Sequence, residues 1–155
     1  MRELKNPMNK HEGYQCFGCA SHNENGLQMK FYEDGDEIVS IWTPKEHFQG
    51  WIDVLHGGIQ STMMDEIASW VVFVKCKTAG VTSRMDIKLK KTVFVNAGNI
   101  TLRAKLKEMK RNIAVIDVKL YNADDEVCAM AEIQYFTYPI EVAKEMLYYP
   151  GADAF

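Results

Sequence analysis

Apolar and polar residues alternate in most of the chain after residue 26, in runs separated by short polar turns. Alternation predicts strands, because successive side chains of a strand point to opposite faces of a sheet. The predicted strands cover residues 27–32, 37–42, 82–93, 99–108, 113–121 and 126–137. The turn at 33–36 contains the Asp-Gly pair typical of hairpins. Consecutive strands with short turns pair antiparallel, so the pattern indicates an antiparallel sheet.

One segment, residues 57–77, breaks this pattern. It contains no turn signal and is longer than a usual strand, so we expect a helix. Apolar residues recur there at spacings of three and four, and they are Ile59, Met63, Ile67, Trp70, Val71 and Val74. Such a broad apolar stripe predicts a helix that is mostly enclosed. A second line, of Thr62, Asp65 and Ser69, predicts hydroxyl groups beside the carboxylate.

The overall organisation expected is α+β, with a sheet wrapped around one long central helix. We divide the chain into an N-terminal arm (1–26), a main domain (27–138) and a C-terminal extension (139–155) with a short helix over 140–148. The length of 155 residues and the 47% apolar content suit one domain with its own core. The net charge of −3 argues against a general nucleic-acid binder.

The compartment and redox state are also constrained by composition. No apolar run approaches the roughly 18 to 20 residues of a membrane span, and the first residues lack the apolar core of a signal peptide. We therefore expect a cytoplasmic protein without membrane partners. Of the four cysteines, only Cys16 and Cys19 are close in sequence, which is no secreted disulfide pattern.

The candidate chemistry lies at the start of the predicted helix. Gly57 and Gly58 leave the first-turn amides accessible, so their N–H groups are candidates to hold an oxyanion. Asp65 is a carboxylate among apolar neighbours, and it is the candidate general base or nucleophile. Glu66 is rotated about 100° from Asp65 on a helix, so we favour Asp65. His56 is either a structural hydrogen-bonding residue or a group that orients the substrate.

The cysteine pair of the arm has two interpretations. His11, Cys16, Cys19 and His22 have the residue types of a Cys2His2 zinc site. A tight turn that packs the arm onto the domain is the simpler interpretation, and it predicts no bound metal.

Three motifs together carry a family resemblance, and they are Cys16-Phe17-Gly18-Cys19, His47-Phe48-Gln49-Gly50-Trp51, and His56-Gly57-Gly58 followed by Asp65. From about residue 16 to about residue 138 the chain resembles the acyl-CoA thioesterases of the hotdog fold, in the phenylacetyl-CoA-thioesterase-like branch. The resemblance implies hydrolysis of an acyl-CoA substrate to free acid and CoA, with Asp65 catalytic. It implies no metal and no cofactor besides the CoA of the substrate.

The resemblance also assigns positions around the reacting group. Thr82 matches a position at which related enzymes carry a hydroxyl that helps to hold the water, and Gln49 is offset by one from an asparagine near that water. Trp51 belongs to a segment expected to form a pocket wall. Among the basic residues, Arg84 and Lys88 are candidates to bind the CoA phosphates.

Two other functions remain as alternatives. A hotdog dehydratase acting on carrier-protein thioesters would use a histidine loop like His47-Phe48-Gln49-Gly50, but it needs a helix carboxylate where this chain has Ser61. A non-catalytic acyl-CoA-binding protein would not need Asp65. The acyl group that is hydrolysed is left open by the sequence.

The spacing within the helix predicts a homodimer, alone or as part of a dimer of dimers. Gly57 and Asp65 are eight residues apart, which is about 12 Å along a helix axis. The oxyanion donor and the base must act on the same carbonyl group, within about 3 Å of it. We therefore expect each site to combine Asp65 of one subunit with Gly57 of another.

Overall fold

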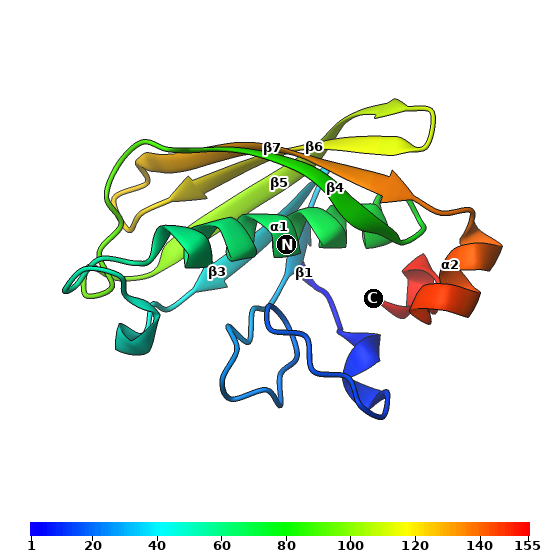
Figure 1. Cartoon of the computed structure of the whole chain (residues 1–155), viewed down its shortest axis with the longest axis horizontal. Coiled ribbons are helices and arrows are strands. Elements are labelled where there is room, and N and C mark those ends of the chain that lie inside the picture. The colour runs from blue at the N-terminus through cyan, green and yellow to red at the C-terminus, as the bar shows by residue number, and fades with distance from the viewer.

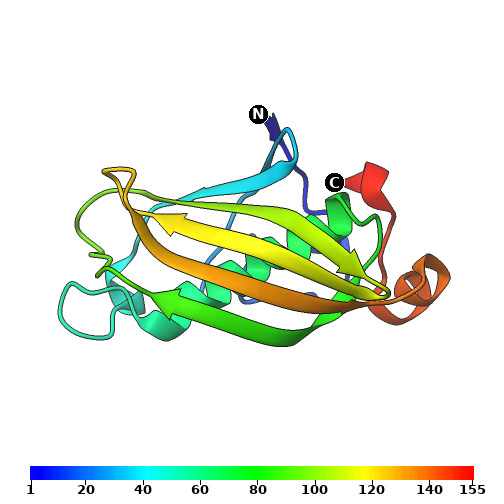
Figure 2. The same ribbon diagram turned by 90° about the horizontal axis from the view of Figure 1, so that it is seen from above.

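The computed structural model describes the whole chain, residues 1–155, and consists of one antiparallel sheet that curves over a long helix (Figure 1). The sheet has seven strands in the order β1-β2-β3-β5-β6-β7-β4. Their bounds are β1 Arg2–Glu3, β2 Tyr32–Asp34, β3 Glu37–Trp42, β4 Gly80–Leu89, β5 Ile100–Lys110, β6 Ile113–Tyr121 and β7 Val127–Thr137. Seen from above, the helix lies beneath the strands of the sheet (Figure 2). The predicted α+β architecture is thus confirmed.

The helix α1 (Gly57–Val74) begins where the sequence predicted and ends three residues earlier than expected. Its apolar side chains fill the space under the sheet, and Met63, Ile67 and Val71 are fully buried. The chain turns away after Lys75, and Lys77 has a left-handed backbone with a φ of 56°. A helix cannot continue through that conformation. No helix of the structure is long and apolar enough to cross a membrane.

The first predicted strand is wrong over residues 27–31. Leu27, Met29 and Phe31 are buried as their alternation suggested. Their backbone, however, bonds to the N-terminal arm, because the Leu27 N–H donates to Phe17 O and the Met29 N–H to Gly18 O. The strand β2 therefore begins only at Tyr32. The hairpin to β3 is confirmed, and Gly35 occupies its turn with a φ of +63°.

The strand β4 forms one edge of the sheet. It pairs with β7 alone, and its other edge has no neighbour. It ends at Leu89, four residues before the predicted end, because the Lys90 and Lys91 amides both turn to Cys128 O. The bounds of β5 and β7 differ from the prediction by one or two residues, and those of β6 agree with it.

The arm after β1 and the C-terminal segment lie on the side of α1 that faces away from the sheet (Figure 1), whereas β1 itself pairs with β2 at the sheet edge. The arm contains β1 and the 3-10 helix η1 (Pro7–Lys10), which the sequence did not predict. The expected C-terminal helix is α2 (Ile140–Leu147), followed by the 3-10 helix η3 (Ala152–Ala154). Phe155 stacks on Phe73 and meets the edge of Trp70, so the last residue is part of the core. A further 3-10 helix, η2 (Glu46–Phe48), precedes α1.

Candidate active site

The first turn of α1 is capped by its own histidine. The Gly58 N–H donates to His56 Nδ1 at 2.8 Å. This bond requires an unprotonated Nδ1, so a neutral His56 carries its proton on Nε2. The Gly58 amide is thereby engaged, whereas the Gly57 amide donates to no protein group. Of the two candidate oxyanion donors, only Gly57 has an unengaged N–H at the positive end of the helix dipole.

The Asp65 carboxylate lies in the middle of α1 and faces β4 and β7. The Thr82 hydroxyl of β4 donates to Asp65 Oδ1 at 2.8 Å, and the Tyr135 hydroxyl of β7 lies 2.7 Å from the same oxygen. Oδ2 receives no hydrogen bond from the protein. Two hydroxyls thus orient the carboxylate through one oxygen and leave the other available to a ligand. The structure therefore brings Thr82 to Asp65.

Tyr135 is the residue of this site that the sequence analysis missed. Its side chain is only 4% exposed, and its hydroxyl also lies 2.9 Å from the Asp65 carbonyl oxygen. Burial, and then the nearby negative charge of Asp65, raise the pKa of Tyr135, so the hydroxyl stays a donor. A signal was present, because a tyrosine on the inward face of a strand needs a partner for its hydroxyl.

The hydroxyl neighbours predicted for Asp65 on its own helix are wrong. The Thr62 hydroxyl donates to Gly58 O at 2.9 Å, and the Ser69 hydroxyl donates to Glu66 O at 2.7 Å. Serine and threonine in helices commonly bond to a carbonyl of the preceding turn in this way. The residues that contact Asp65 come instead from two strands.

Glu66 faces the other side of α1, as its rotation from Asp65 predicted. Its carboxylate oxygens lie 3.5 and 3.6 Å from Cys16 Sγ, in the N-terminal arm. Burial, with a smaller contribution from Cys16, raises the pKa of Glu66 to about 8. Cys19 donates to Cys16 across 3.6 Å, and this bond lowers the pKa of Cys16.

The histidines proposed for a Cys2His2 site lie elsewhere. His22 Nε2 is 2.6 Å from the Tyr14 carbonyl oxygen, and the His11 ring packs against Tyr148 with centroids 4.4 Å apart. The Cys2His2 set is therefore not assembled, and Glu66 takes the place beside the two cysteines.

The candidate substrate-binding residues line the outside of the molecule. The Gln49 side chain accepts a hydrogen bond from the Asp53 amide at 2.6 Å and so folds onto its own loop. Trp51 is 84% exposed at the tip of that loop, next to a hollow of about 340 Å³ that also includes His56 and Gly57. Arg84 and Lys88 are exposed on β4 and form no ion pair. Other basic residues are engaged, as in the pairs Lys91–Glu126 and Lys110–Glu108.

A hollow of about 740 Å³ lies beneath the N-terminal arm and includes neither Asp65 nor Gly57. Its walls come from Glu3–Asn6, Asn9, Cys19, Ser21, Leu27–Phe31, Ile41–Thr43, Lys45 and Trp70. The position of Asp65, not the size of a cavity, therefore identifies the candidate active site.

The fold is that of known thioesterases. A thioesterase from Haemophilus influenzae is 19% identical, with a TM-score of 0.65 over 74% of this chain and 80% of its own. A hypothetical thioesterase from Streptococcus pneumoniae, solved with coenzyme A, is 20% identical, with a TM-score of 0.67 over 72% and 87%. The PaaI protein of the Escherichia coli phenylacetic acid degradation operon is 18% identical, with a TM-score of 0.64 over 73% and 81%.

The amino-acid sequence also resembles that of thioesterases. Residues 53–129, which include α1 and the strands β4 to β6, match the model of the thioesterase superfamily. This segment is therefore similar to the thioesterase superfamily, and the chain has the hotdog fold. No curated protein matches the chain.

Proposed function

We propose that the protein is an acyl-CoA thioesterase that hydrolyses the thioester to a free acid and CoA. The observation that carries the proposal is the setting of Asp65, whose Oδ1 is held by two hydroxyls while Oδ2 has no protein donor. The coenzyme A in the Streptococcus pneumoniae neighbour supports a CoA thioester as the substrate. A carboxylate held in this way also argues against the non-catalytic binding protein.

The chemistry requires a nucleophile at the thioester carbonyl and a donor for its oxygen. Asp65 either takes a proton from an attacking water or attacks the carbonyl itself to form an anhydride that water then cleaves. In both routes the CoA thiolate leaves and the carbonyl oxygen gains negative charge in the transition state. The Gly57 N–H, at the start of α1, is the proposed donor to that oxygen. The role of Gly58 is then to hold His56 in its tautomer, with Nε2–H available to the substrate.

Each active site is proposed to form between two subunits through the free edge of β4. Along β4, Thr82 lies beside Asp65 and Leu89 lies beside Gly57. If two copies of β4 pair antiparallel with Thr82 opposite Leu89 of the other copy, Asp65 of one subunit comes next to Gly57 of the other. By symmetry the same pairing forms a second, equivalent site.

The surface of β4 is consistent with such pairing. Val81, Met85 and Leu89 are 44, 49 and 50% exposed, although β4 is one of the longer strands. Long edge strands with exposed apolar residues are rarely left uncovered in solution. Arg84 and Lys88 lie on the same strand, so the dimer would carry them near each site, where they are proposed to meet the phosphates of CoA.

The first experiment measures hydrolysis of a panel of aryl- and fatty-acyl-CoA substrates by wild type and Asp65→Asn. We expect the variant to keep its fold and its affinity for CoA and to lose turnover by about 10² or more. An unchanged kcat would remove Asp65 from the mechanism. A 3-hydroxyacyl carrier-protein thioester, with loss of water to the 2-enoyl thioester followed in place of thiol release, would distinguish the dehydratase alternative.

The shared site has its own test. Gly57→Pro removes the proposed donor at the first helical position, where proline is well tolerated and where the preceding His56 has the extended backbone that proline requires. Gly57→Ala, which retains the N–H, is the control. Each of Asp65→Asn and Gly57→Pro should be inactive alone. After subunit exchange, an equal mixture should recover about a quarter of wild-type activity, since half of the dimers then hold one intact site. A mixture that stays inactive despite proven exchange would falsify the shared site.

A further inference from the structure

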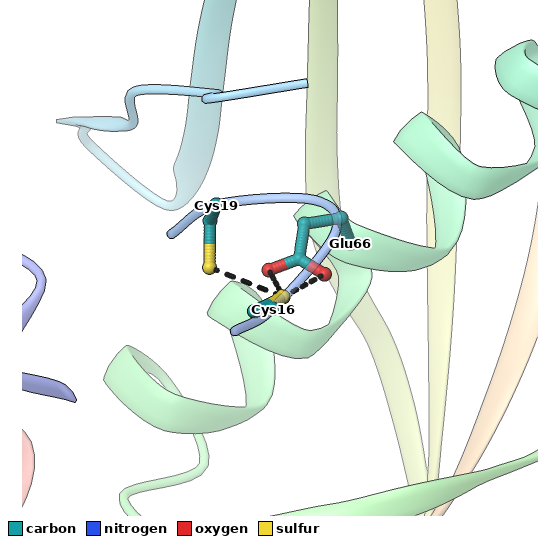
Figure 3. A group of neighbouring side chains, drawn as sticks. All are labelled: Cys16, Cys19 and Glu66. Atoms are coloured by element: carbon teal, nitrogen blue, oxygen red, sulfur yellow. Dashed lines mark hydrogen bonds between the residues drawn. The ribbon is translucent and has the colours of Figure 1, made fainter. Parts of the chain in front are cut away.

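Apart from the active site, one group of side chains has no role in the proposed reaction: Cys16 and Cys19 of the arm and Glu66 of α1 (Figure 3). We propose that this Cys16/Cys19/Glu66 cluster binds a thiophilic divalent cation, with Zn²⁺ the best fit, and that the cation ties the arm to α1. The thiols and the carboxylate point toward one another from segments far apart in the sequence.

The distances between the candidate ligands suit tetrahedral coordination. With zinc bonds of about 2.3 Å to sulfur and about 2.0 Å to oxygen, tetrahedral geometry separates two sulfurs by about 3.8 Å and a sulfur from an oxygen by about 3.5 Å. The two sulfurs are 3.6 Å apart, and Cys16 Sγ lies 3.5 Å from Glu66 Oε2. All three ligand atoms lie within 4.8 Å of one another.

The surroundings supply negative charge and no protein cation. A cavity of about 250 Å³ adjoins the cluster, and no lysine, arginine or histidine lines it. Glu66 takes part in no salt bridge. A divalent cation would displace the protons that the thiols and the carboxyl group carry without it, and it would supply the positive charge that no protein side chain supplies here.

Hydrogen-bond donors surround the second sulfur as they surround metal-bound thiolates. The Tyr14 hydroxyl lies 3.1 Å from Cys19 Sγ, and Asn6 Nδ2 lies 3.4 Å from it. Such outer contacts fix the direction of a ligand and stabilise its charged form.

Two further observations favour a ligand here. The Trp70 indole N–H has no hydrogen-bond partner although Trp70 is only 2% exposed, and this side chain lines the same cavity. A water molecule or another fourth ligand of the cation, bound in this cavity, would lie near the indole N–H of Trp70. In addition, a Cβ at Gly18 would lie 2.5 Å from Glu66 Cδ, so the Glu66 side chain would have to move away from this position if Gly18 were replaced.

The sequence alone favoured a tight turn at Cys16 and Cys19 without a bound metal. Glu66 is distant along the chain, and only the fold brings it to the two cysteines. It does not depend on the proposed hydrolase activity, and its test uses no substrate.

The test begins with the metal content of the full-length protein purified under reducing conditions. We expect one equivalent of zinc per chain, or uptake of one equivalent when Zn²⁺ is added to chelator-treated protein. Co²⁺ added instead should produce thiolate-to-metal absorption in the near ultraviolet and intense visible bands typical of tetrahedral cobalt. Removal of the metal should lower Tm by about 5 °C or more.

Variants locate the site. Cys16→Ser and the isosteric Glu66→Gln should each lose the metal, whereas Cys76→Ser, which changes another partly buried free cysteine, should retain it. If a variant fails to fold, the stoichiometry and the cobalt spectrum of the wild type still decide. The proposal is overturned if the wild type takes up neither ion, if Glu66→Gln and Cys16→Ser both bind a full equivalent, or if the isolated protein contains a Cys16–Cys19 disulfide.

Discussion

Replacing Tyr135 by phenylalanine tests whether the hydroxyl contacts of Asp65 matter for catalysis. The change removes only the hydroxyl that lies 2.7 Å from Asp65 Oδ1 and leaves the buried ring in place. A hydrogen bond to a charged group contributes about 1.5–3 kcal/mol. The single hydroxyl hydrogen of Tyr135 is shared between Asp65 Oδ1 and the Asp65 carbonyl oxygen, so we take the lower end of this energy range. About 1.5 kcal/mol corresponds to a fall in kcat/KM of roughly 10-fold.

The assay follows release of free CoA thiol with a chromogenic disulfide and separates kcat from KM. A positioning role predicts that most of the loss is in kcat, since Tyr135 orients the reacting carboxylate and contacts no CoA group in this proposal. Tyr149→Phe is the matched control, because its hydroxyl donates to the Phe73 carbonyl oxygen of α1 at 2.7 Å, away from Asp65. Both variants should lose similar stability in thermal denaturation. Equal kcat values for Tyr135→Phe, Tyr149→Phe and wild type would refute the reasoning.

Two further outcomes are expected. Changing Arg84 and Lys88 to alanine together should raise KM for acyl-CoA about 10-fold or more, with little change in kcat. Hydrolysis of a short thioester without phosphates should be unaffected. Equal effects on both substrates would exclude phosphate binding by these two residues. Hydrogen bonds from Lys75 and Arg2 lower the pKa of Glu33 in the folded protein. Its ion pairs therefore stabilise the fold fully at a pH above the pKa of Glu33 in the unfolded chain, about 4.3. This stabilisation is lost as the pH falls through the lowered pKa of the folded state. Glu33→Gln should therefore lower Tm near neutral pH, with a difference from wild type that shrinks below about pH 4; a constant difference would contradict this.

The elements that depend on local pattern could be predicted from the sequence. The helix α1 follows from a long apolar run without a turn signal, and the β2–β3 hairpin follows from its Asp-Gly turn. The prediction failed at residues 27–31, where the alternation reports burial correctly. There the backbone partners are the Phe17 and Gly18 carbonyls of the arm, and no local pattern encodes a contact of that kind.

The candidate site divides in the same way. Asp65 and Gly57 belong to one continuous motif, so their candidacy was visible in the sequence. Tyr135 and Cys16 contact α1 only because of the fold, seventy residues after Asp65 and fifty before Glu66 respectively. Helical spacing favoured Thr62 and Ser69 as neighbours of Asp65, and it failed because both hydroxyls bond to helix carbonyls instead. Side-chain competition of that kind is decided by rotamers, which periodicity does not describe.

The free edge of β4 also affects how the chain reaches its final state. A newly folded single subunit presents the free edge of a ten-residue strand, with three exposed apolar residues, to any other chain it meets. Pairing in the wrong register, or with a partly folded chain, would use the same backbone groups. If the proposed dimer forms through this edge, correct assembly and aggregation compete for one surface. Refolding yield should consequently depend on protein concentration, and a lysine placed at Met85 would protect the monomer from aggregation while preventing assembly.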